Sequence, residues 1–106
     1  MSGRLNILGV SFYHRFERTR DLADISEAIL YLQKALHLTP EGHADMPGYL
    51  DNLGNSFLRR FQRTGDIADI SDAISHQQRA VIYTPEGHAA MLSWLNNLGV
   101  SFRIRF

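Results

Sequence analysis

The sequence predicts an all-α fold, an antiparallel helix-pair solenoid of about five helices. A unit of 45 residues recurs along the chain, and residues 39–44 return unchanged as residues 84–89. Within each unit, two stretches place apolar side chains three and four positions apart, which is the spacing of one helix face. The chain therefore divides into a first unit at 5–49, a second unit at 50–94 and a half unit at 95–106.

The first helix of the second unit is expected over residues 46–62. Pro47 falls in its first turn, where a missing backbone N–H is tolerated, and Gly65 follows as a stop. The corresponding helices of the other units are expected over 4–17 and 91–105. The apolar stripe of the helix at 46–62 consists of Leu50, Leu53, Phe57 and Phe61.

The second helix of each unit is expected over residues 21–38 and 66–83. Asp21 and Asp66 precede these stretches and suit the N-cap position, where a carboxylate accepts hydrogen bonds from free backbone N–H groups. Gln77 interrupts the second of the two apolar stripes. The stripe of the helix at 21–38 consists of Leu22, Ile25, Ile29, Leu32 and Leu36.

Small residues recur at matching places in both kinds of helix. Gly9, Gly54 and Gly99 stand in the middle of expected helices, where glycine is unfavourable by about 1 kcal/mol relative to alanine. Their recurrence predicts that a second helix approaches closely there. The alanines that would form the facing column are Ala28, Ala35, Ala73 and Ala80.

Composition and motifs exclude several classes of function. The net charge is zero, so no overall field attracts nucleic acid, and no apolar run is long enough to span a membrane. The chain has no cysteine and no catalytic or phosphate-binding motif, so we expect neither enzyme activity nor a cofactor. His43 and His88 are equivalent turn residues, expected to bond local backbone rather than a metal. A cytoplasmic protein is expected.

The repeated unit resembles the tetratricopeptide repeat (TPR). The residues that carry the resemblance are Leu50, Leu53, Gly54, Phe57, Ala73, Ala80 and Pro85. Leucine stands where that family has tryptophan, and Gln77 departs from its pattern. The usual unit of about 34 residues is lengthened here between and after its helices, as in repeats of the kinesin-light-chain type. The amino-acid sequence of the unit is most similar to that of fungal arrays, which are often linked to caspase-like (CHAT) or nucleotide-binding switch domains.

The resemblance implies a protein-interaction scaffold that binds a peptide or helix in a concave groove lined by the first helix of each unit. In that family, asparagines on this helix hold the backbone of an extended peptide. Asn52 and Asn97 match best, whereas Ile7 occupies the place in the first unit. The alternative is that the asparagines bond adjacent loops. The peptide-binding candidates are Asn6, Asn52, Asn55, Arg59, Asn96 and Asn97.

Recurring arginines allow two interpretations. They can form a basic strip for an acidic peptide, or they can be compensated by aspartates at the start of the following helix. The arginines are Arg15, Arg18, Arg60, Arg63 and Arg105, with Arg59 beside them.

For the last expected helix we expect either concentration-dependent self-association or disorder of its last turn, because the sequence shows no capping helix to cover its stripe. The residues of that stripe are Leu95, Leu98, Phe102 and Phe106. An alternative function is a structural or regulatory segment of a longer protein that carries the effector domain elsewhere.

Overall fold

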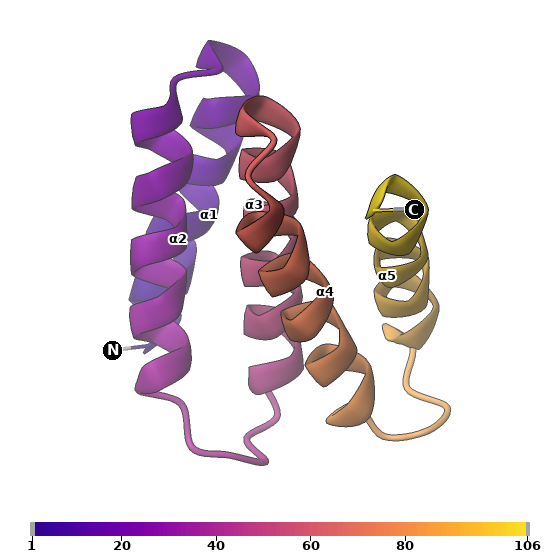
Figure 1. Cartoon of the computed structure of the whole chain (residues 1–106). Helices are drawn as coiled ribbons and strands as arrows, with labels where there is room; N and C mark the ends of the chain where they lie inside the picture. The colour runs from indigo at the N-terminus through magenta and orange to yellow at the C-terminus, as the bar shows by residue number, and fades with distance from the viewer. Residues whose placement is uncertain (1, 106) are drawn as a thin grey trace.

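The computed structural model describes residues 2–105 and shows an all-α fold of five helices (Figure 1). The described residues form no strand. The prediction of an all-α chain is confirmed, and every helix end lies within two residues of the expected one. The helices are α1 (Ser2–Thr19), α2 (Leu22–His37), α3 (Met46–Thr64), α4 (Ile67–Ile82) and α5 (Met91–Arg105).

Local chemistry sets the helix ends. The side chains of Asp21 and Asp66 cap α2 and α4, each accepting a hydrogen bond of 3.0 Å from the backbone N–H of Ala23 or Ala68. Helix α3 ends at Gly65, which adopts a left-handed conformation (φ 78°) that glycine takes without steric penalty. Both the caps and the stop are confirmed as the sequence predicts them.

The helices pack in chain order, so that α3 contacts α2 on one side and α4 on the other. Figure 1 shows α1 and α2 side by side and antiparallel, with α5 at the opposite edge of the molecule. The stripes of neighbouring helices bury one another in a continuous core. Its most enclosed hydrophobic members are Phe16, Ile25, Ala28, Leu32, Leu53, Ile70 and Ala73. Five helices do not define a superhelix, and the solenoid remains a prediction.

Two of the three mid-helix glycines lie at close helix contacts, as expected. A Cβ added to Gly9 would lie 2.7 Å from a side-chain carbon of Leu32 and 3.2 Å from the carbonyl oxygen of Ala28. A Cβ added to Gly54 would lie 2.6 Å from Gln77. Gly99 differs, because nothing lies within 4 Å of the same position on α5.

Candidate functional site

A strip of polar side chains crosses α1, α3 and α5, and we call it the polar strip. Asn52 donates a hydrogen bond of 3.1 Å from Nδ2 to Oδ1 of Asn6, and Asn97 donates bonds of 3.1 Å to both carboxylate oxygens of Asp51. Each pair is separated by 46 positions, one repeat unit plus one residue. The strip therefore joins equivalent helices of successive units.

Asp51 is the most unusual member of the polar strip, because its carboxylate is buried, with 4% of the residue exposed. Burial raises the pKa of Asp51 above its ordinary value of 3.8, since removal from water disfavours the charged form. Hydrogen bonds from Asn97 and Asn55 to the carboxylate oppose that rise in pKa. The two amides thus take the place of water around the carboxylate.

Gln77 extends the polar strip into the interior between α3, α4 and α5. It is fully buried, donates to Oδ1 of Asn55 at 2.9 Å, and accepts at Oε1 from the Ser101 hydroxyl at 2.6 Å. At the equivalent places in the first unit stand Val10 and Leu32. The interruption of the apolar stripe in α4 is therefore matched by a second change in α3, and the resulting polar pair is satisfied.

Arg59 and Asn96, the other candidates, differ in their engagement. Arg59 donates from Nε to the Tyr13 hydroxyl at 3.1 Å and from Nη1 to Gln62 at 2.7 Å. Asn96 is exposed and makes no side-chain hydrogen bond within residues 2–105. The alternative that the asparagines bond adjacent loops is wrong, since the bonded ones reach side chains on helices.

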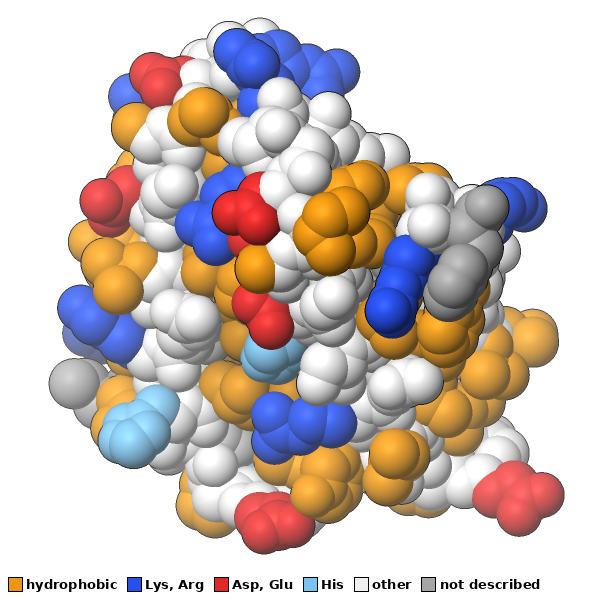
Figure 2. All heavy atoms as spheres, in the orientation of Figure 1, with side chains coloured by type: hydrophobic (Ala, Val, Ile, Leu, Met, Phe, Trp, Pro, Cys, Tyr) orange, Lys and Arg blue, Asp and Glu red, His pale blue; other side chains and the backbone are white. Residues whose placement is uncertain are grey.

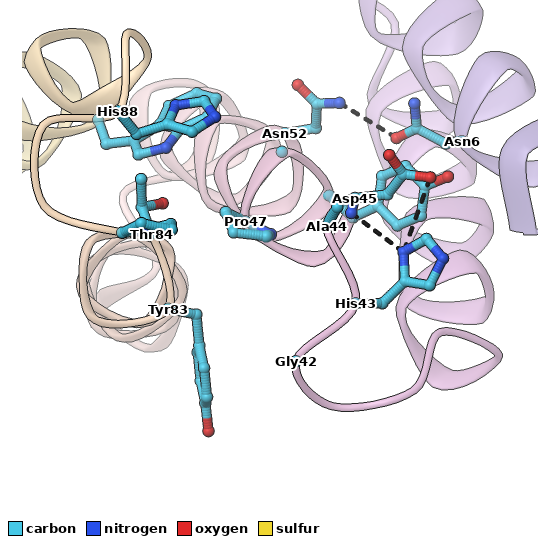
Figure 3. A pocket seen from close by; sticks show the side chains of 14 residues that line it. Asn6, Gly42, His43, Ala44, Asp45, Pro47, Asn52, Tyr83, Thr84 and His88 are labelled. Carbon is cyan, nitrogen blue, oxygen red and sulfur yellow. Dashed lines mark hydrogen bonds and ion pairs between the residues drawn. The ribbon is translucent and has the colours of Figure 1, made fainter.

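A pocket of about 480 Å³, which we call the loop pocket, adjoins the polar strip at Asn6 and Asn52 (Figure 3). It lies between the α2–α3 and α4–α5 loops. Tyr83 donates a hydrogen bond of 2.8 Å to Glu41, which joins the two loop regions. The remaining lining includes two aromatic residues, two prolines and two histidines. They are Tyr49 and Trp94, Pro47 and Pro85, and His43 and His88.

The two histidines of the loop pocket have the predicted turn role. Nδ1 of His43 accepts from the backbone N–H of Asp45 at 3.1 Å, and Nδ1 of His88 accepts from Ala90 at 3.0 Å. An accepting Nδ1 carries no proton, so the proton of each neutral ring is on Nε2. In Figure 3 the two rings lie on opposite sides of Pro47. Among residues 2–105, no three His, Asp or Glu side chains are grouped so as to hold a metal ion.

The loop pocket was not predicted from the sequence, although the sequence contains one signal of it. Tyr49 and Trp94 are repeat equivalents, and both are aromatic. The indole Nε1 of Trp94 is buried and has no hydrogen-bond partner in the described part of the chain. Buried donors are nearly always paired, so this N–H is an exception within residues 2–105.

Two of the recurring arginines are compensated rather than presented as a basic strip. Arg60 makes a two-pronged contact with the buried carboxylate of Asp69, at 3.0 and 2.9 Å. Arg15 makes the equivalent contact with Asp24 at 3.3 Å. The compensating aspartates are those at the start of the following helix, so the charge-compensated interpretation is confirmed for these two pairs.

The last helix is buried differently from the expected stripe. Ser101, which bonds Gln77, is its only buried residue among those described, and four partly buried hydrophobic side chains of α5 also pack against the core. Leu98 and Phe102 are half-buried, and Leu95 is exposed. Phe106, the last residue of the expected stripe, lies outside the described residues.

Comparisons of the chain with protein-family models, with curated proteins and with solved structures found no match. Within residues 2–105, no helix is both long and apolar enough to cross a membrane.

Proposed function

We propose that this protein is a cytoplasmic interaction scaffold of the tetratricopeptide type that binds an extended peptide at the loop pocket and the adjoining polar strip. The observation that carries the proposal is a pocket that two aromatic side chains, Tyr49 and Trp94, line together with two asparagine amides, Asn6 and Asn52. Apolar walls with a few polar groups are the usual composition of a binding pocket.

The chemistry of the pocket suits a peptide backbone next to an apolar side chain. Asn52 uses one N–H for Asn6, which leaves its carbonyl oxygen and second N–H for a peptide amide. Tyr49 and Pro47 line the same space and offer apolar contact to a side chain of the ligand.

The repeat pattern gives independent support. The first helix of each unit carries the polar strip, and this is the helix that lines the groove in the family that the sequence resembles. Asn52 and Asn97 each bond a side chain on a neighbouring helix. A ligand would therefore extend an existing network rather than fill an empty one.

Gly48 provides a test, because it lines the loop pocket and a Cβ added there meets nothing within 4 Å. Peptides would be selected from a displayed random library on the 106-residue protein. Their affinities would then be measured for Gly48→Leu and for the matched control Ser26→Leu, an exposed position on α2 outside the pocket lining. Gly48→Leu should weaken binding by about tenfold or more, since the new side chain fills the pocket. Selected peptides that bind Gly48→Leu as well as the unchanged protein would overturn the proposal.

A second candidate is a structural or regulatory segment of a longer protein whose effector is a caspase-like or nucleotide-binding switch domain. The bonds from Asn97 to Asp51 favour this candidate, because they hold α5 against α3 without any ligand. In that case the library would yield no peptide, and Asn97→Ala would lower the free energy of unfolding by about 1–3 kcal/mol by leaving a buried carboxylate underbonded.

A further inference from the structure

Helix α5 repeats residues of α1 and α3, the first helices of the two complete units. Its sequence matches both helices at five positions, of which the glycine and the phenylalanine contact the following helix in α1 and α3. In α1 and α3 the glycine of this set lies against the carbonyl oxygen of Ala28 or Ala73 on the following helix. The five positions in α5 are Leu95, Leu98, Gly99, Phe102 and Arg105.

The same contacts recur around the glycines of α1 and α3. Phe12 stacks on Tyr31 with ring centroids 5.6 Å apart, and Phe57 stacks on His76 at 5.4 Å. Both pairs join the first helix of a unit to the second, and they stand at equivalent positions. The seat for the second helix is therefore built twice at equivalent positions, with the same glycine and phenylalanine on the first helix and different partners on the second.

On α5 the part of this set around Leu95 and Gly99 is open, whereas Leu98 and Phe102 pack partly buried against the core. Nothing lies within 4 Å of the Cβ position of Gly99, and Leu95 is 47% exposed, whereas its equivalent Leu50 is completely buried. Leu92 continues the exposed face one turn earlier. Figure 2 shows hydrophobic side chains gathered at the α5 edge of the molecule. We call the surface of Leu92, Leu95 and Gly99 the α5 face.

We propose that the α5 face docks an amphipathic helix of a partner protein, with a helix surface like those of α2 and α4. The α5 face continues an interface present in the molecule, because α3 is covered by α2 on one side and by α4 on the other. Helix α5 packs on α4 and α3, and within the described chain no helix covers its other side. This surface is distinct from the loop pocket.

The glycine determines what the partner helix must look like. At the occupied seats the backbone oxygens of Ala28 and Ala73 come within 3.2 and 3.1 Å of the glycine Cβ position, and both alanines are fully buried. Only a small residue in the partner allows two helix backbones to approach so closely. The partner helix must therefore place alanine opposite Gly99, with a longer side chain four residues later, as Leu32 follows Ala28.

A synthetic peptide with the sequence of residues 21–38 serves as the probe, because it contains a helix that fits such a seat. Its binding to the 106-residue protein would be followed by fluorescence anisotropy. Gly99→Leu should weaken binding by about tenfold or more without changing the circular dichroism, since the leucine enters open space. Ser93→Leu, an exposed change elsewhere on α5, is the matched control and should leave binding unchanged.

A second peptide that carries Ala28→Leu should also bind the protein more weakly, because its larger side chain lies opposite Gly99 in the helix contact. Equal binding of the first peptide to the Gly99→Leu and unchanged proteins would overturn the proposal. Concentration-dependent self-association that Gly99→Leu abolishes, without peptide binding, would also overturn it by making a second copy the occupant. Gly48→Leu should leave the affinity for this peptide unchanged. Failure of the loop-pocket proposal can therefore be told apart from failure of the proposal for the α5 face.

Discussion

The three mid-helix glycines provide a matched test, because substitution by alanine is expected to lower stability at one position and to raise it at another. Gly54→Ala adds a methyl group where Gln77 Cγ lies 2.6 Å and the carbonyl oxygen of Ala73 lies 3.1 Å away. The backbone oxygen cannot move without shifting α4. Gly99→Ala adds the same group to open space. We expect Gly54→Ala to destabilise the protein and Gly99→Ala to stabilise it.

The magnitudes follow from two opposing effects. Alanine in a helix interior is more favourable than glycine by about 1 kcal/mol, and this gain applies at both positions. Overpacking of a closed helix contact costs about 1–3 kcal/mol and applies to Gly54 alone. The net change is therefore a loss of up to about 2 kcal/mol for Gly54→Ala and a gain of up to about 1 kcal/mol for Gly99→Ala.

Urea unfolding followed by circular dichroism measures these differences. With a denaturant dependence of about 1–3 kcal/mol per molar urea, the two variants should differ in midpoint by about 1 M. Gly9→Ala, whose Cβ would meet Leu32 at 2.7 Å, should behave like Gly54→Ala. If all three variants shift the midpoint in the same direction, the close helix contacts do not explain the recurrence of glycine.

Three further predictions concern single residues. Arg20 has a left-handed backbone (φ 61°) at the position equivalent to Gly65. Arg20→Gly should therefore raise the free energy of unfolding, measured in urea, by about 0.5–1 kcal/mol. A lower free energy of unfolding would contradict the strain argument. Arg60→Ala should lower the free energy of unfolding by about 1–3 kcal/mol, because the buried carboxylate of Asp69 loses a bidentate partner. Arg15 is more exposed, so Arg15→Ala should lower the free energy of unfolding by less than about 1 kcal/mol. Equal losses from the two arginine variants would show that burial does not decide the strength of these ion pairs. The pKa of Asp51 is raised in the folded state, so the folded chain binds more protons, and stability should fall as pH rises from about 3.8 through the folded pKa. Asp51→Asn should remove this part of the pH dependence of unfolding, and an unchanged pH profile would contradict it.

The sequence by itself determined the helices and their ends. Capping by Asp21 and Asp66, the stop at Gly65 and the spacing of apolar residues are interactions within a few positions of one another. Such local interactions recur wherever their residues recur. The 45-residue repeat therefore predicted five helices and the close contacts at Gly9 and Gly54.

Only the tertiary structure decided which partners the polar residues take. The hydrogen bond between Asn97 and Asp51 spans 46 positions. It forms only when the packing of side chains between α3, α4 and α5 sets the relative positions of these helices. Sequence spacing did not show that Asn52 and Asn97 bond side chains on neighbouring helices, and it overlooked the buried Asp51. Likewise, Gly99 has the sequence surroundings of Gly54, yet no helix covers it. The same residues become core or surface according to whether a neighbouring helix removes them from water, and the spacing along one helix does not contain that information.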